Sequence, residues 1–205
     1  MKIIAFAGLA QAGKTTAAQA AAAHLFNSGF SPVVEQFARP LKEAAALLGF
    51  HKGGDTDHLY RWFCQMAGER ARKEDPDWFV NLMSDRLDVI AQEEADRLTL
   101  GGDGPFHETV VLIDDMRFMN ERDKVRAYAG KTMFVSSERR LPDLGAEWRS
   151  HVSELMAQQY EHGILPDDTF DMTVSNNDPK GIESFMNTVA TTVLQTVVSA
   201  REEIL

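Results

Sequence analysis

Eight residues near the start of the chain restrict its fold and chemistry more than any other stretch. Residues 8–15, GLAQAGKT, match the pattern G-x-x-x-x-G-K-[ST]. The apolar residues 2–7 come before the pattern, and the alanine-rich residues 15–26 follow it. These flanks predict a buried strand and then a helix, which is the context in which this pattern forms a phosphate-binding loop.

Each residue type in this loop has a physical reason to bind a triphosphate. Glycine lets backbone N–H groups turn toward the phosphates, and the helix N-terminus adds partial positive charge. Lys14 supplies a mobile cation, and the Thr15 hydroxyl is a ligand for Mg²⁺. We therefore expect ATP and Mg²⁺ to bind here. The expected phosphate-binding residues are Gly8, Gln11, Ala12, Gly13, Lys14, Thr15 and Thr16.

A second element with magnesium chemistry follows an apolar run at residues 109–113, which predicts another buried strand. Asp114 and Asp115 come directly after this run. A carboxylate at such a strand end, beside the phosphate loop, is the expected second magnesium contact. Because side chains alternate along a strand, only one of the two aspartates should face the metal, and the sequence leaves open which one.

Strands alternate with helices along the chain, which predicts an α/β protein. Strands are expected at residues 2–7, 33–37, 109–113, 132–135 and 170–174, and helices at 15–26, 40–48, 59–73, 78–98, 120–128, 151–160 and from 182 onward. We expect one P-loop domain over residues 1–205, with three layers and a parallel central sheet flanked by helices. The last helix carries a continuous apolar stripe, which predicts either a core contact or a homodimer contact.

Composition restricts the partners and the location. The formal net charge is −10, so nucleic acid would need a local basic patch. The single cysteine, Cys64, excludes an internal disulfide and is expected to be an inert core thiol. No apolar run is long enough for a membrane span and no signal-peptide pattern follows the start, so we expect a cytoplasmic protein without a membrane partner.

Arginines are the most distinctive candidates for an acceptor site. They are spread over segments expected near one edge of the sheet, at Arg39, Arg61, Arg70, Arg72, Arg117, Arg139, Arg140 and Arg149. Several converging arginines would suit phosphoryl transfer, which depends on positioning and charge neutralisation. Arg61 and Arg72 would lie about 16 Å apart on one helix, so at most one should contact the acceptor phosphate.

Six stretches together narrow the function further. They are GLAQAGKT at 8–15, FARPLK at 37–42, ERAR at 69–72, DWFVN at 77–81, IDDMRF at 113–118 with Asn120 and Glu121, and HVSE at 151–154. With them, the sequence resembles the phage-type P-loop deoxynucleoside monophosphate kinases of the thymidylate/adenylate kinase-like superfamily. The resemblance covers most of the chain in the family's order. It implies transfer of the ATP γ-phosphate to a deoxynucleoside 5′-monophosphate in a phage-infected bacterial cell.

The resemblance also implies roles for particular residues. Residues 39–98 would form a helical acceptor region and residues 136–160 a lid. The acceptor would be surrounded by Arg39, Lys42, Arg72, Trp78 and Arg117, and the catalytic residues would be Lys14, Arg117, Arg139 and Arg140. The chain departs from the family at Arg39, where many members have aspartate, and at residues 67–70, which read AGER in place of GTEW.

Two other functions fit the same motifs. One is a phage DNA kinase acting on 5-hydroxymethyluracil within DNA, with Asp114 or Asp115 as a base for the neutral hydroxyl and with Arg39, Arg61, Arg70, Arg72 and Lys73 gripping the backbone. The other is an ATP-binding regulatory module that transfers nothing. His151 is expected to be a helix-start or surface residue.

Overall fold

The computed structural model describes residues 1–99, 108–137, 151–177 and 180–202, with side chains described as far as residue 199. The elements are β1 (Lys2–Ala7), α1 (Lys14–Asn27), β2 (Ser31–Glu35), α2 (Arg39–Leu47), α3 (Asp57–Glu74), α4 (Trp78–Thr99), β3 (Thr109–Ile113), α5 (Met119–Ala127), β4 (Lys131–Ser136), the 3₁₀ helix η2 (Val152–Glu154), α7 (Leu155–Glu161), the 3₁₀ helix η3 (Asp167–Thr169), β5 (Met172–Ser175) and α8 (Ile182–Glu202).

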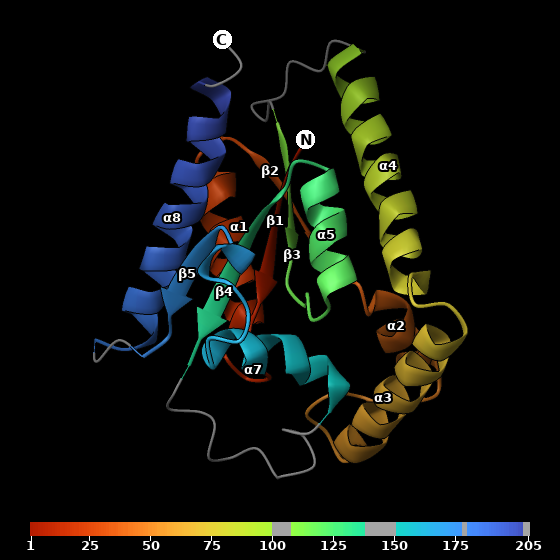
Figure 1. Ribbon diagram of the computed structural model, residues 1–205. Coiled ribbons are helices and arrows are strands. Elements are labelled where there is room, and N and C mark those ends of the chain that lie inside the picture. The colour runs from red at the N-terminus through yellow and green to blue at the C-terminus, as the bar shows by residue number, and fades with distance from the viewer. Residues whose placement is uncertain (100–107, 138–150, 178–179, 203–205) are drawn as a thin grey trace.

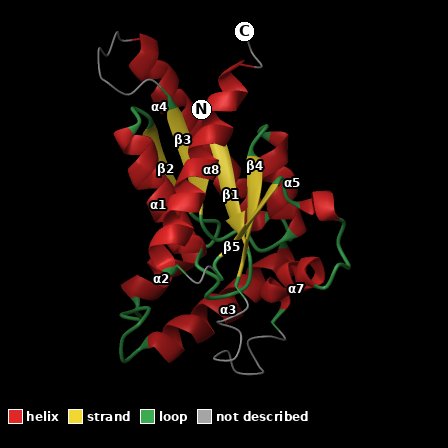
Figure 2. Ribbon diagram, turned by 90° about the vertical axis from the view of Figure 1, so that its left-hand side faces the viewer, coloured by secondary structure: helices red, strands yellow, loops and turns green. Residues whose placement is uncertain are grey.

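The five strands form one parallel sheet in the order β2-β3-β1-β4-β5. Helices α1 and α8 cover one face, whereas α4 and α5 cover the other (Figures 1 and 2). This arrangement confirms the expected three-layer α/β fold with a parallel central sheet. Among the described helices, none is long and apolar enough to cross a membrane.

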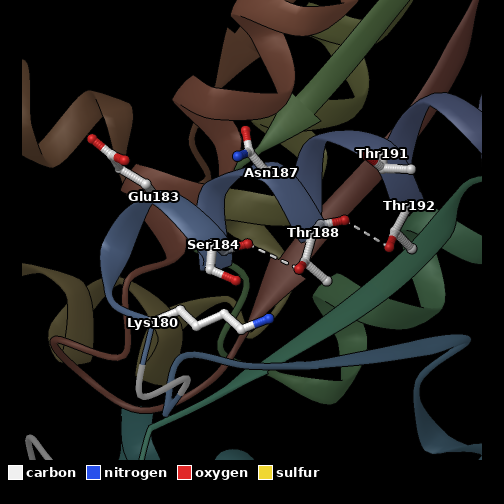
Figure 3. A pocket seen from close by; sticks show the side chains of 7 residues that line it. All are labelled: Lys180, Glu183, Ser184, Asn187, Thr188, Thr191 and Thr192. Carbon is white, nitrogen blue, oxygen red and sulfur yellow. Dashed lines mark hydrogen bonds between the residues drawn. The ribbon is translucent and has the colours of Figure 1, made fainter.

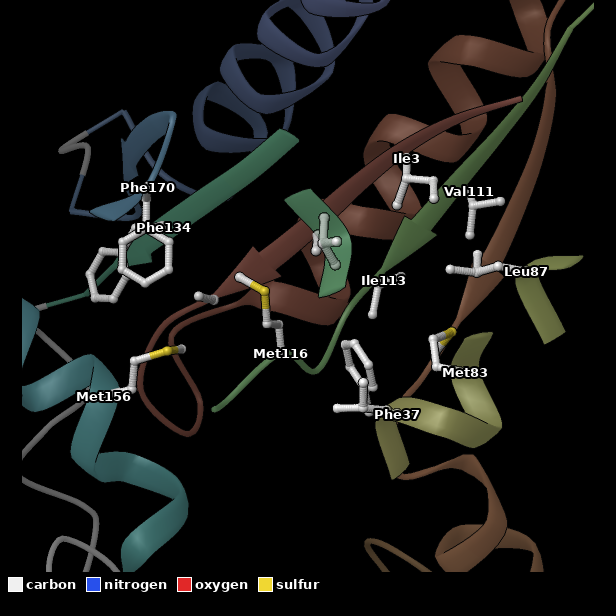
Figure 4. Close-up of a cluster of buried hydrophobic side chains, with 14 of the residues drawn as sticks. Ile3, Phe37, Met83, Leu87, Val111, Ile113, Met116, Phe134, Met156 and Phe170 are labelled. Atoms are coloured by element: carbon white, nitrogen blue, oxygen red, sulfur yellow. The ribbon is translucent and has the colours of Figure 1, made fainter. Parts of the chain in front are cut away.

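Each face of the sheet has its own apolar core. On the α4 and α5 side, side chains from both strands and helices interlock, including Met83 and Leu87 of α4 with Ile113 of β3 (Figure 4). On the other side, fully buried alanines of α1 let α8 pack closely, so that Phe185 and Val189 reach the sheet. The apolar stripe of the last helix is therefore a core contact.

The bounds of β2, β4 and β5 differ from the sequence expectation by one or two residues, and two of these differences have a visible cause. The second strand ends at Glu35 rather than at residue 37, because the N–H of Phe37 donates to the Asp115 carboxylate (2.7 Å) instead of joining a ladder. The last strand begins at Met172 rather than at residue 170, because the N–H of Asp171 donates to Thr132 Oγ1 (3.2 Å) and the N–H of Thr132 donates to the Asp171 carboxylate (2.9 Å) in place of ladder bonds. The expected helix at residues 151–160 also begins with the 3₁₀ turn η2.

Candidate active site

The sheet topology brings the candidate residues to one edge. β1 lies between β3 and β4, so the phosphate loop after β1, Asp114 after β3 and Ser137 after β4 all follow the carboxyl ends of neighbouring strands. Ligands in open α/β sheets bind at such an edge, where the strand order switches sides. Helices α2, α3 and α7 lie beyond this edge (Figure 1).

The phosphate loop needs glycine at two positions. Gly8 has φ +136°, and a Cβ there would lie 2.3 Å from the carbonyl oxygen of Val135. Gly13 has φ +105°, and its Cβ would lie 2.7 Å from Asn176 Nδ2. That same Nδ2 donates to the Ala12 carbonyl (2.8 Å). The Val135 carbonyl therefore excludes a side chain at Gly8, whereas at Gly13 the positive φ is what disfavours any other residue.

Lys14 is the first residue of α1, and its buried side chain folds back into the phosphate loop. Its ammonium group donates to the carbonyls of Gly8 (2.7 Å) and Leu9 (2.8 Å). Burial, and then the positive charge of Arg117, lower the pKa of Lys14 from 10.5 to about 7. Glu154, Asp115 and Asp114 only partly oppose this lowering, and a triphosphate would add further negative charge next to the amine.

The two aspartates after β3 have different surroundings. Asp115 accepts from the N–H groups of Phe37 (2.7 Å) and Ala38 (3.2 Å) and from Lys42 Nζ (2.9 Å), so both of its oxygens are engaged. Asp114 is buried, and its Oδ1 accepts from Gln36 Nε2 (2.7 Å). Its Oδ2 is buried without a hydrogen-bond partner. Asp114 therefore retains an oxygen for a ligand, whereas Asp115 anchors the start of α2.

These residues suit Mg²⁺ in the way that it usually binds proteins. Magnesium takes one or two protein oxygens and completes its shell with phosphate oxygens and water. The unpartnered oxygen of Asp114 and the hydroxyl of Thr15, exposed in the first turn of α1, are oxygen donors of this kind. Among the described residues, no group of three His, Cys, Asp or Glu side chains could hold a metal by itself.

Arg117 and the phosphate loop share one partner, Glu154. Oε1 of Glu154 forms an ion pair with Nη1 of Arg117, and Oε2 accepts from the N–H of Ala10 (2.6 Å). Nη1 of Arg117 also donates to Ser153 Oγ (3.1 Å). His151 caps this turn, because its Nδ1 accepts from the N–H of Ser153 (3.2 Å), which confirms the helix-start role expected for His151.

Arg72 is held beside the same cluster by an ion pair and two rings. Its Nη2 lies 3.2 Å from Glu121 Oε1, and its guanidinium lies over the rings of Phe118 (4.0 Å) and Phe79 (4.3 Å). Glu121 also accepts from the N–H groups of Arg117 (2.7 Å) and Phe118 (3.2 Å). Burial raises the pKa of Glu121 to about 7. Glu121 thus fixes the turn that carries Arg117.

Several other expected residues lie outside this cluster or in its rim. Arg39 pairs with buried Glu35 (2.7 Å), which also accepts from Arg86, and Arg61 pairs with Asp57 (2.5 Å) in the preceding helical turn. Of Arg61 and Arg72, only Arg72 therefore joins the cluster. Lys42 reaches it through Asp115, and Trp78, at the start of α4, is partly exposed against Phe79. The expected lid arginines Arg139 and Arg140, and the candidate Arg149, lie outside the described residues.

Glu121 and Glu154 are site residues that the sequence reasoning left without a role, and Ser137 follows β4 at the same edge of the sheet. Glu121 accepts from the N–H of Phe118 three positions earlier, as a capping glutamate does, but Phe118 is not one of the N-cap residue types that make this spacing recognisable in a sequence. Glu154 lay within the matching HVSE stretch without a role. Ser137 has a buried hydroxyl without a hydrogen-bond partner, and no sequence pattern distinguishes it.

A separate open hollow of about 580 Å³ lies along the first turns of α8. Its lining residues are Lys180, Glu183, Ser184, Asn187, Thr188, Thr191 and Thr192 (Figure 3). The hydroxyls of Thr188 and Thr192 donate to helix carbonyls one turn earlier. This hollow contains none of the phosphate-loop residues, and the hydroxyls of Thr188 and Thr192 are already bonded within the helix.

Comparisons with protein-family models and with curated proteins give no match. Among solved structures, the chain is similar to a shikimate kinase from Bacteroides thetaiotaomicron, with 17% identity, coverage of 97% of this chain and 98% of that chain, and a TM-score of 0.48. It is also similar to a sugar kinase from Janibacter sp. HTCC2649, with 14% identity, coverage of 95% of this chain and 93% of that chain, and a TM-score of 0.48. A gluconokinase from Sinorhizobium meliloti 1021 is similar with 14% identity, coverage of 99% of this chain and 95% of that chain, and a TM-score of 0.46. At these values the function has to be inferred from the residues of the site.

Proposed function

We propose that this protein is an ATP-dependent phosphotransferase that converts deoxynucleoside 5′-monophosphates to diphosphates. One observation carries the choice of acceptor. Of the four carboxylates around the loop, Asp115, Glu121 and Glu154 have both oxygens engaged, and only Asp114 has an oxygen without a partner. The described site therefore offers one available carboxylate oxygen.

This single oxygen can serve either a metal or a proton, but not both. A neutral hydroxyl acceptor needs a base in addition to the metal contact. The oxygen of a monophosphate acceptor is already anionic and needs no base. Asp114 can then be the metal contact, which together with Thr15 would hold Mg²⁺ on the triphosphate. A monophosphate acceptor is thus the choice that the described carboxylates support best.

The cationic residues have complementary roles in this reaction. An acceptor phosphate oxygen forms the new bond to the γ-phosphorus of ATP, and the bond to the bridging oxygen breaks to release ADP. Lys14 and the loop N–H groups would hold the donor phosphates. Arg117 would hold the acceptor phosphate beside them, and Arg72 would support it from the ring-lined side. Magnesium, when bound, would neutralise charge on the β- and γ-phosphates.

The DNA-kinase alternative loses support from the same contacts. Its backbone grip relied on arginines of the acceptor region, yet Arg39 pairs with Glu35, Arg61 with Asp57 and Arg70 with Glu74. These ion pairs reduce the positive charge available to a polyanion. Modified DNA therefore enters the test as an outcome rather than as a second proposal.

The test is an ADP-release assay with ATP and Mg²⁺. It compares the four deoxynucleoside monophosphates, 5-hydroxymethylated thymidine analogues and DNA that contains the modified base. We expect turnover with free monophosphates, and we expect Arg117→Ala to weaken use of the acceptor far more than ATP binding. Arg70→Ala is the matched control, since Arg70 is exposed and pairs within its own helix. Turnover with modified DNA alone, or ATP binding without any turnover, contradicts the proposal.

A further inference from the structure

Glu154 makes a contact that an ATP site would not be expected to contain. Its carboxylate is only 5% exposed and reaches the phosphate loop from η2, which is distant from that loop in sequence. One oxygen accepts from the N–H of Ala10, and the other pairs with Arg117. A single side chain therefore joins the donor loop to the arginine assigned to the acceptor.

The negative charge at this position has a cost. A buried carboxylate beside a phosphate-binding loop repels the phosphates that the loop binds, and burying the charge carries a desolvation penalty. A neutral amide could satisfy the N–H of Ala10 without that repulsion. The contact that requires a carboxylate is the ion pair with Arg117, because a carboxylate binds a guanidinium more strongly than a neutral amide does.

The rest of the turn makes this contact stiff. Ser153 Oγ accepts from the same Nη1 of Arg117 (3.1 Å), and the His151 ring caps the backbone of the turn. On the other side, Glu121 holds the N–H of Arg117 (2.7 Å). Arg117 is thus fixed at both its backbone and its guanidinium, and Glu154 connects that guanidinium to the phosphate loop through the N–H of Ala10.

We propose that Glu154 is a positioning residue that sets the distance and orientation between Arg117 and the phosphate loop. This inference rests on the proposed function, because it concerns the alignment of acceptor and donor phosphates. In-line transfer depends on that alignment, and a misplacement of about 1 Å can reduce the rate about 100-fold. The loop N–H groups and Lys14 hold ATP directly, so ATP binding should depend less on the position of Arg117 than transfer does.

Replacing Glu154 should therefore change ATP affinity and the rate of transfer differently. Glu154→Gln preserves the size of the side chain and an acceptor for Ala10, but removes the charge that holds Arg117. We expect ATP affinity to be unchanged or higher, because a repelling anion is lost, while kcat for transfer falls about 10- to 100-fold. Glu154→Asp retains the charge but is one methylene too short to span both partners, and we expect the same split.

The experiment measures three quantities for each variant: Tm, affinity for a non-hydrolysable ATP analogue by calorimetry, and single-turnover transfer to the best monophosphate acceptor. Glu93→Gln, at an exposed position of α4, is the control with the same change in net charge. Adding Glu154→Gln to Arg117→Ala should reduce transfer little further, because both changes remove the same alignment.

The possible outcomes are separable. Retained ATP affinity with reduced transfer in Glu154→Gln or Glu154→Asp, and non-additivity with Arg117→Ala, support the inference. Transfer equal to that of the wild type, additive losses, or parallel losses of ATP affinity and Tm overturn it while leaving the proposed function standing. A wild-type protein that binds ATP but transfers to no acceptor overturns the proposed function and this inference together.

Discussion

The buried lysine of the phosphate loop should take up a proton when ATP binds. In the ligand-free protein, burial and the charge of Arg117 lower the pKa of Lys14 to about 7. A bound triphosphate places several negative charges next to this amine and raises its pKa again. Lys14 should then be fully protonated in the complex across the neutral range.

The size of the uptake follows from this pKa. At pH 8 about a tenth of Lys14 is protonated in the free protein, so binding should take up about 0.9 proton. At pH 6 about nine tenths is protonated already, so the uptake should be only about 0.1 proton. The same pKa affects folding: between pH 7 and 10.5 the unfolded chain binds more protons at this residue, so its contribution to stability rises with pH.

Calorimetry of a non-hydrolysable ATP analogue with Mg²⁺ measures the uptake, when titrations are repeated in buffers of different ionisation enthalpy. Lys14→Met is the control, since it retains the length of the side chain without a titrating group. The difference between wild type and Lys14→Met removes the protons exchanged by the nucleotide itself. An uptake that is the same at pH 6 and pH 8, or that persists in Lys14→Met, would refute the reasoning.

Three further changes test other parts of the site. Gly8→Ala should abolish ATP binding, measured by calorimetry, and lower the free energy of unfolding by about 1–3 kcal/mol, measured by denaturant titration, because its Cβ would lie 2.3 Å from the Val135 carbonyl. Unchanged ATP affinity and stability would argue against this packing. Asp114→Asn should weaken the dependence of transfer on Mg²⁺ with little change in Tm, whereas Asp115→Asn should lower Tm and acceptor affinity; a reversal of these effects would exchange the two roles. Glu121 binds a proton more strongly in the folded protein, so its contribution to stability should be lost as pH rises from about 4.5 to 7. Glu121→Gln should therefore flatten this part of the plot of unfolding free energy against pH, measured by denaturant titration. An unchanged slope would contradict the raised pKa of Glu121.

The sequence predicted the parts of this fold that local patterns encode. The phosphate loop, the strand at Thr109–Ile113 and the apolar stripe of α8 depend on residue type and spacing, and each lies where it was expected. The end of β2 could not be read in this way, because it depends on Asp115, which lies about 80 positions further along the chain. A contact of that separation leaves no periodic signal.

The candidate site shows the same division. Lys14 and the aspartate pair follow from motifs, but the choice between Asp114 and Asp115 depended on which oxygens the neighbouring segment occupies. Glu154 could not be assigned, because its two partners come from other parts of the chain. The number of arginines in the sequence likewise did not show that Arg39 and Arg61 form ion pairs with nearby carboxylates.

The most direct test of the central claim follows the γ-phosphate itself. The protein is incubated with γ-labelled ATP, Mg²⁺ and either one deoxynucleoside monophosphate or DNA that contains 5-hydroxymethyluracil, and the products are separated and identified by mass. Labelled deoxynucleoside diphosphate from the wild type, absent with Lys14→Met, is the predicted result. Label found only in inorganic phosphate, only in modified DNA, or equally in the products of Lys14→Met would contradict the assignment of this site as a deoxynucleoside monophosphate kinase.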